Sequence, residues 1–196
     1  MTDNLKERAA FWRQHLDDLA GSSRGEHDKY AARACRLAVD GMAAGTYGVG
    51  ALLVDEEGEV VIEGHNRVRG PGSFRSDLHA EMVVTNAYEA LELPRHRAKE
   101  FTLVTSLESC PMCLTRLIVA GIGTVLHVAD DPVGGMVGRR QHLPPVFRTI
   151  AEHHEQVWSP ADCSDDLRVA AFRIWDESRA IVNRAARGLN DAARHA

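Results

Sequence analysis

The stretch FTLVTSLESCPMCLTRLIVAGIGTVLHVADD, residues 101–131, contains the pattern that decides the fold. It includes two apolar runs with the composition of strands, FTLVTSL at 101–107 and GTVLHVA at 123–129. Between them, residues 110–120 have the length and composition of a helix. Pro111 falls in its first turn, where a missing N–H needs no partner. Because a helix that connects two strands of one sheet usually leaves them parallel, the stretch predicts a sheet that is at least partly parallel.

The segment before this unit predicts a β-hairpin and a loop. Residues 47–55 and 59–66 are apolar runs separated by the turn sequence EEG. The following residues, 67–77, are rich in Gly, Pro and Ser and are expected to form a loop. Asp77 at its end is placed to cap the next helix.

Helical periodicity of apolar residues marks five further segments. The predicted helices cover 4–20, 27–44, 79–91, 145–154 and 164–187. The order of elements places a helix between successive strands after the hairpin, so helices must cover both faces of the sheet. The sequence therefore predicts an α/β protein, a three-layer α/β/α sandwich with a mixed central sheet.

Composition and charge limit the kind of protein this can be. The chain has 196 residues, of which 44% are hydrophobic, and a formal net charge of −5. The length is typical of one globular domain, and the acidic balance disfavours a nucleic-acid partner. The charged N-terminus lacks the apolar core of a signal peptide, and no apolar run is long enough to span a membrane. We therefore expect a cytoplasmic protein with no membrane partner, in which the isolated Cys35 and Cys163 are reduced and buried.

The pair Cys110-Pro111-Met112-Cys113 can be interpreted in several ways. A redox pair is expected directly after a first strand, whereas two strands and two helices precede this pair. A four-cysteine zinc ribbon needs a second such pair, and a zinc finger needs two suitably spaced histidines downstream; neither is present in the sequence. The remaining interpretation is a zinc site with three protein ligands and an open fourth position, which is the arrangement of catalytic zinc.

A third ligand is suggested by His79-Ala80-Glu81, although a His-x-Glu pattern is weak evidence alone. A second match, His153-His154-Glu155, lies in a polar stretch and is interpreted as a solvated helix end. The first match begins a predicted helix, as does the cysteine pair, and one strand separates them. Two neighbouring helix N-termini could converge on one ion, and their dipoles favour thiolate and carboxylate groups.

These motifs resemble the cytidine-deaminase-like zinc aminohydrolases, whose signature is His-x-Glu followed by Pro-Cys-x-x-Cys. The resemblance covers about residues 27–135 and is greatest to the branch of guanine deaminases, cytosine deaminases and tRNA adenosine deaminases. Asn66 matches an Asn that these enzymes have after the second strand. One departure is Ser109, where the family usually has proline. Ser109 could cap the helix at 110–120 or contact substrate.

The resemblance implies the cofactor and the roles of the site residues. His79, Cys110 and Cys113 would hold Zn²⁺, and the ion would activate water for attack on the carbon that bears the amine. Glu81 would be the catalytic acid and base, taking the proton of water and passing it to a ring nitrogen and to the leaving ammonia. The candidate substrate contacts are Asn66, the backbone of Ala80, Glu108 and Ser109.

The resemblance also implies an organisation and a function. Residues 26–140 would form the zinc deaminase core, and helical extensions at 1–25 and 141–196 would complete the same domain. We expect a zinc-dependent hydrolase that deaminates a small nucleobase or nucleoside in purine or pyrimidine metabolism, as a homodimer. The alternatives are a tRNA-specific adenosine deaminase and an inactive zinc-stabilised binding module. Aromatic residues of the C-terminal part are core residues or could stack on the substrate ring: Phe147, Trp158, Phe172 and Trp175.

Overall fold

A five-stranded mixed sheet forms the centre of the computed structural model, which describes residues 2–19, 25–70 and 73–194. The strand order is β2-β1-β5-β6-β7, with β1 antiparallel to β2 and β5, and β5, β6 and β7 mutually parallel. The strands are β1 (Gly50–Val54), β2 (Val60–His65), β5 (Thr102–Leu107), β6 (Thr124–Ala129) and β7 (Val157–Pro160). The α/β class and the mixed sheet agree with the prediction.

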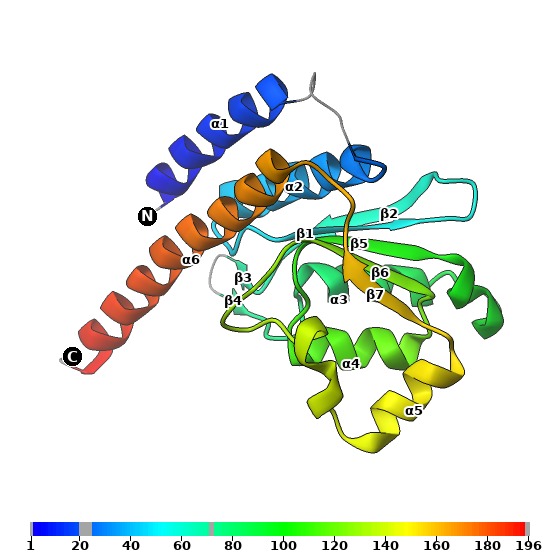
Figure 1. Cartoon of the computed structure of the whole chain (residues 1–196). Helices are drawn as coiled ribbons and strands as arrows, with labels where there is room; N and C mark the ends of the chain where they lie inside the picture. The colour runs from blue at the N-terminus through cyan, green and yellow to red at the C-terminus, as the bar shows by residue number, and fades with distance from the viewer. Residues whose placement is uncertain (1, 20–24, 71–72, 195–196) are drawn as a thin grey trace.

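Helices cover both faces of this sheet. The helices α1, α2 and α6 lie on one face, and α3, α4 and α5 lie on the other (Figure 1). Short 3₁₀ helices, η1 (Arg95–Glu100) and η2 (Val137–His142), occur in two connections. The α-helices are α1 (Thr2–Leu19), α2 (Asp28–Ala43), α3 (Ala80–Glu89), α4 (Pro111–Ala120), α5 (Pro145–His153) and α6 (Asp165–Arg194). The predicted three layers are therefore present.

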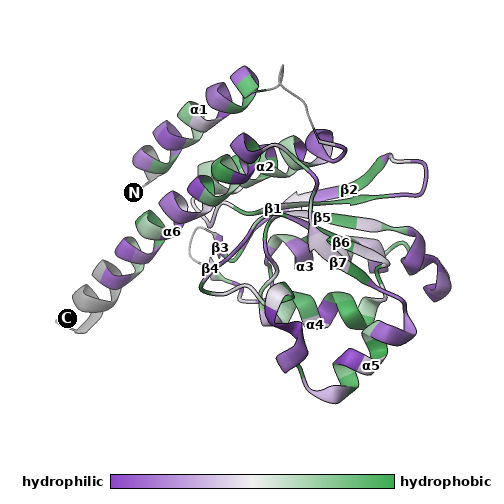
Figure 2. Ribbon diagram, in the orientation of Figure 1, coloured by the Kyte–Doolittle hydropathy of each residue, from purple (hydrophilic) through white to green (hydrophobic). Residues whose placement is uncertain are grey.

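Burial explains the layers, because the central strands are apolar on both sides. All five residues of β1 are buried, as are five of the six residues in each of β5 and β6. A strand that is covered on both faces is usually rich in apolar residues, and these strands bury few polar ones, Thr105, Ser106 and His127. Figure 2 shows the complementary pattern in α6, where hydrophilic and hydrophobic segments alternate along a helix with one face on the core.

The N-terminal helix α1 is tied to α6 as well as to α2. The side chains of Arg8 and Trp12 both donate to Glu177 Oε2, at 2.8 and 3.1 Å, and Arg13 pairs with Asp40 of α2. Trp12 is 6% exposed, so its ring also contributes apolar burial to this contact. These interactions hold α6 against the rest of the molecule.

Three local predictions were wrong. The segment 67–77 contains a small hairpin, β3 (Arg69–Gly70) paired with β4 (Ser73–Phe74), and was predicted as a loop. Asp77 does not cap α3, because His79 is the N-cap residue and Asp77 pairs instead with Arg75. Strand β7 was not predicted; it is a short edge strand that ends in proline, which leaves little strand signal in the sequence.

The two isolated cysteines are buried, as predicted. Cys35 is fully buried in α2, and burial raises the pKa of its thiol to about 12. Cys163 is 8% exposed, and burial raises the pKa of its thiol too. Within the described residues, no helix combines the length and the hydropathy that crossing a membrane requires.

Candidate metal centre and its cavity

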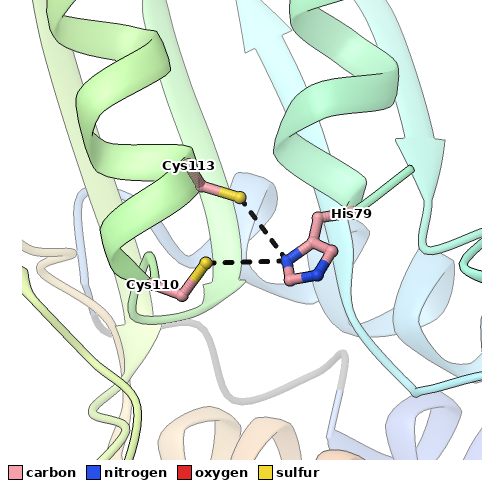
Figure 3. A group of neighbouring side chains, drawn as sticks. All are labelled: His79, Cys110 and Cys113. Carbon is pink, nitrogen blue, oxygen red and sulfur yellow. Dashed lines mark hydrogen bonds between the residues drawn. The ribbon is translucent and has the colours of Figure 1, made fainter. Parts of the chain in front are cut away.

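The N-termini of α3 and α4 converge at the carboxyl end of β5. His79 is the N-cap residue of α3 and Cys110 is the N-cap residue of α4, both with extended backbone. Cys113 follows in the first turn of α4. Figure 3 shows the two sulfur atoms and the imidazole turned toward one another from these two helix ends. The predicted convergence of the two motifs is thus a property of the fold.

The three side chains have the spacing of ligands around one ion. The Sγ atoms of Cys110 and Cys113 lie 3.7 and 3.6 Å from the same atom, His79 Nδ1. The three ligand atoms all lie within 4.8 Å of one another. Tetrahedral zinc, with Zn–S near 2.3 Å and Zn–N near 2.0–2.1 Å, would separate sulfur and nitrogen ligands by about 3.5–3.6 Å. The donor set and its spacing therefore fit zinc.

Electrostatics around the cysteines favour a thiolate. The Cys113 thiol, and after it His79, lower the pKa of Cys110 to about 4 by hydrogen bonding. The same bond raises the pKa of Cys113, and the bond to Cys110 raises the pKa of His79. A charged sulfur at a helix N-terminus is further stabilised by the helix dipole. Thiolate is the form of cysteine that binds zinc.

Glu81 lies one residue inside α3 and is 3% exposed. Burial, followed by the charge of Cys110, raises the pKa of its carboxyl, which makes it able to hold a proton. Ser109 is fully buried, and its hydroxyl oxygen has no hydrogen-bond partner among the described residues. The hydroxyl still has a small lowering effect on the pKa of Glu81, opposite to that of burial. Ser109 does not cap α4, because Cys110 occupies the N-cap position with no side-chain cap bond.

A cavity of about 260 Å³ opens beside the three ligands. His79, Glu81 and Cys110 line one side of it, and Asn66 and Glu108 also line it. Ala80 and Ser109 are fully buried beside this group. Ala80 is the first residue of α3, where main-chain N–H groups lack a partner within the helix.

Asn66 has a defined orientation. Its Oδ1 accepts a hydrogen bond from Thr46 Oγ1 at 2.8 Å and another from the backbone N–H of Val68 at 3.0 Å. Because a backbone N–H can only donate, the atom that it contacts must be the amide oxygen. The Asn66 amide nitrogen is left to donate into the cavity.

Glu108 organises the loop after β6. One of its oxygens accepts the N–H of Asp131 at 3.1 Å, and the other accepts the N–H of Gly138 at 2.9 Å. The backbone of Gly135 passes so close that a Cβ there would lie 2.0 Å from Glu108 Oε2. Glu108 therefore contributes to the cavity both as a lining residue and by holding its wall in place.

Gly135→Ala tests this role of the loop. The added methyl must displace the Glu108 carboxylate or the loop, so we expect a loss of about 1–3 kcal/mol of unfolding free energy. Thermal melting of the purified variant measures this loss of stability. The control is Gly138→Ala in the same loop, because a Cβ there would lie 3.9 Å from Glu108 Oε1, an ordinary contact distance. Equal destabilisation of the two variants would contradict the close packing inferred at Gly135.

Several lining residues were missed by sequence reasoning. Asp131 follows β6 directly and is 7% exposed, and its Oδ1 accepts from the N–H groups of Val133 and Gly134. Its position at the carboxyl end of a parallel strand could have indicated a site residue, because ligand-binding sites in such sheets lie at that edge. Three other polar lining residues lie in a loop or on α6, where nothing in the sequence distinguished them: Tyr47, Arg179 and Asn183.

The structure also places the four aromatic candidates and the second His-x-Glu match. Of the four aromatic residues proposed to stack or pack, Trp175 lines the cavity, whereas Trp158 is 8% exposed in the core and Phe147 and Phe172 pack against that core. The second His-x-Glu match lies at the end of α5, with His153 and Glu155 exposed. It is the solvated helix end that was predicted.

Comparison with known proteins gives a family match. Residues 24–129 match the model of the cytidine and deoxycytidylate deaminase zinc-binding region. This range contains the three candidate ligands and Glu81, and it ends before the loop after β6 and before α6.

Curated relatives include tRNA-modifying enzymes and a nucleobase deaminase. The chain is 34% identical over 119 residues to the tRNA-specific adenosine deaminase of Bacillus subtilis, covering 60% of this chain and 71% of that protein. It is 30% identical over 105 residues to the guanine deaminase of Bacillus subtilis, covering 53% and 65%. The chain is also 36% identical over 90 residues to the tRNA(Ile)-lysidine synthase of Deinococcus radiodurans. This match covers 46% of this chain but only 15% of that protein.

A solved structure agrees with the fold. A protein from studies of A-to-I editing by tRNA:A34 deaminases at the wobble position superimposes with a TM-score of 0.56 and 28% identity. The match covers 72% of this chain and 94% of the other.

Proposed function

Because the chain belongs to the cytidine and deoxycytidylate deaminase zinc-binding family, we propose that it is a zinc-dependent hydrolase of small amino-heterocycles. The substrate is a nucleobase or nucleoside of guanine or cytosine type, and the products are the oxo-heterocycle and ammonia. One observation carries the proposal: a buried carboxyl, Glu81, lines the same small cavity as the candidate ligands His79 and Cys110.

The chemistry divides between the ion and the chain. When bound, zinc would supply Lewis-acid chemistry, which lowers the pKa of water to near neutrality. His79 Nδ1 and the sulfurs of Cys110 and Cys113 would hold the ion beside the cavity. The Glu81 carboxyl takes a proton from water, delivers it to a ring nitrogen and then protonates the departing amine, so that one water replaces one ammonia. Asn66 Nδ2 donates to an acceptor of the heterocycle and orients it.

The size of the cavity supports a small substrate. Its volume of about 260 Å³ lies below the 300–1,000 Å³ typical of sites for drug-sized ligands. Trp175, Arg179 and Asn183 of α6 form part of its wall. A nucleotide flipped out of a polynucleotide needs room beside the cavity for its flanking backbone, and α6 occupies one side of this cavity.

A second candidate is deamination of adenosine in tRNA. The identity to the tRNA-specific adenosine deaminase of Bacillus subtilis favours it. The formal net charge of −5 counts against it, because a partner bound through phosphates calls for a basic surface.

An ammonia-release screen tests the proposal. The zinc-loaded protein is incubated with guanine, cytosine, adenine, their nucleosides and related aminated heterocycles, and with tRNA at physiological salt. We expect release of ammonia from at least one free base or nucleoside and no inosine in the tRNA. Inosine formation without activity on any small molecule would establish the second candidate, and no activity at all would favour an inactive binding module.

We also propose that the protein is a homodimer in the cytoplasm and acts in purine or pyrimidine metabolism. The helical extensions at 1–25 and 141–196 complete the same domain as the core at 26–140. Reduced thiols support the location, because the site needs free cysteines and Cys35 and Cys163 are unpaired as well. Exposed apolar side chains on α4, Met112 and Val119, support a self-contact. Light scattering after gel filtration measures the oligomeric state.

A further inference from the structure

Thr46 is a buried polar residue in the loop between α2 and β1, next to the cavity residue Asn66. It is 1% exposed, and its hydroxyl has two partners. Oγ1 donates to Asn66 Oδ1 at 2.8 Å and accepts the backbone N–H of Arg69 at 3.3 Å. Both partners follow β2 in the chain. One hydroxyl therefore connects the loop before β1 to the segment after β2.

The directions of these hydrogen bonds follow from their chemistry. A backbone N–H can only donate, so the contact with Arg69 uses a lone pair of the Thr46 oxygen. The hydroxyl proton is then directed to Asn66 Oδ1, which also accepts the backbone N–H of Val68 at 3.0 Å. Hydrogen bonds that run in one direction along a chain strengthen one another. The Asn66 oxygen is thus held by two donors.

The nitrogen of the Asn66 amide is the end that faces the cavity. Asn66 lines the cavity, and Nδ2 is not among the buried, unpartnered side-chain atoms of the described residues. Nδ2 therefore keeps accessible surface, through which a bound molecule can reach it. Inverting the amide would place this nitrogen against the Val68 N–H and leave the Thr46 proton without its acceptor.

The two donors fix different properties of the amide. The Val68 N–H decides which end of the amide points away from the cavity, because only an oxygen can accept from it. The terminal torsion of an asparagine side chain is soft, so one hydrogen bond leaves the plane of the amide free to rotate. The second hydrogen bond, from Thr46, fixes that plane.

The loop that carries Thr46 is itself held by α6. Tyr47 Oη donates to Asn183 Oδ1 at 2.9 Å, and the backbone N–H of Gly48 donates to Ser178 Oγ at 2.7 Å. Ser178 is fully buried, so this second contact is shielded from water. A loop that is anchored in this way keeps the Thr46 hydroxyl in place, as the support of a precise site requires.

We propose that Thr46 is a positioning residue for the deamination. It fixes the plane of the Asn66 amide, so that Nδ2 donates to an acceptor atom of the heterocycle and keeps the carbon that bears the amine beside the metal ligands. The inference rests on the proposed function, in which Asn66 orients the heterocycle. It adds a residue that acts through Asn66 and makes no contact with the substrate. Small errors in the position of a reacting group are costly in rate.

A double-mutant cycle between Thr46 and Asn66 tests this role. The probe is the fastest substrate among guanine, cytosine, adenine and their nucleosides, and kcat and KM for ammonia release are measured on zinc-loaded protein. Thr46→Val removes the hydroxyl but keeps the branched shape. We expect it to lower kcat/KM by about 3- to 10-fold, the range for one hydrogen bond. In the Asn66→Ala background its effect should be less than about twofold, because the group that Thr46 positions is gone.

Two further variants separate positioning from a loss of the fold. Thr46→Ser keeps the hydroxyl and should recover most of the lost rate. Thr105→Val is the matched control, because Thr105 is fully buried on β5 and its Oγ1 has no hydrogen-bond partner among the described residues. This control should work at nearly the wild-type rate. Circular dichroism shows whether each variant is folded, and Thr46→Ala takes the place of Thr46→Val in the cycle if the Val variant is not.

The position of the amide can also be followed without any substrate. In the nuclear magnetic resonance spectrum of isotope-labelled protein, the side-chain N–H signals of Asn66 are assigned by their absence in Asn66→Ala. We expect these signals to shift or broaden in Thr46→Val and to stay near their wild-type positions in Thr46→Ser and Thr105→Val. The measurement needs no turnover, so it tests the role of Thr46 independently of the reaction.

Three results would overturn the inference. They are equal losses of kcat/KM from Thr46→Val in the wild-type and Asn66→Ala backgrounds, a loss in Thr46→Ser as large as that in Thr46→Val, and unchanged Asn66 signals in Thr46→Val. The proposed function fails separately, if the wild-type protein releases no ammonia from any heterocycle.

Discussion

Replacing Glu81 by glutamine is expected to lower kcat by about 10²- to 10⁴-fold, the usual contribution of a general acid and base. Glutamine keeps the size of the side chain but cannot accept and return a proton. Zinc content should stay at the wild-type value, because Glu81 is not one of the three grouped ligands. Ammonia release and metal analysis on the same preparation measure both quantities.

The control for this variant is Glu89→Gln at the other end of α3. Glu89 is exposed and pairs with Arg116 across the surface, so its loss should leave the rate near wild type. A Glu81→Gln enzyme that works at nearly full rate would remove Glu81 from the proton-transfer role. Loss of zinc from this variant would instead show that the carboxyl supports the metal.

Cys113→Ala is expected to release the metal and with it the activity. Cys113 is fully buried, and its sulfur lies 3.6 Å from His79 Nδ1, so no solvent ligand can easily take its place. Zinc should fall from about one ion per chain to almost none. The loss of activity should exceed the about 10- to 100-fold effect of removing an outer partner of a metal ligand. Atomic absorption and the ammonia assay measure the two changes.

The matched control is Cys163→Ala, which also removes a buried thiol but lies away from the three ligands. This variant should retain zinc and most of the activity, even if the small cavity lowers the melting temperature. Unchanged zinc content in Cys113→Ala would show that the ligand set is wrong. A similar loss of zinc in both variants would point to a general loss of the fold.

Local patterns in the sequence were enough to predict the layers and the metal centre. The strand–helix–strand unit at 101–129 implies parallel strands, and the cysteine pair at its helix start implies a ligand group at the strand end. His79 begins the neighbouring helix in the same way, and the structure has both at N-cap positions. These predictions succeed because the ligands occupy helix starts, and a helix start is specified by residues a few positions apart.

The rest of the cavity depends on contacts between distant segments. Arg179 and Asn183 belong to a long amphipathic helix, and its periodicity shows only that one face is covered. Whether a covered residue faces the core or the cavity depends on what packs beside it, here Gly48 and Tyr47, more than a hundred residues earlier. The same holds for the orientation of the Asn66 amide, which Thr46 and Val68 determine. The spacing of residues along the chain therefore specified the candidate metal ligands, whereas the packing of α6 on the core determined which of its side chains line the cavity.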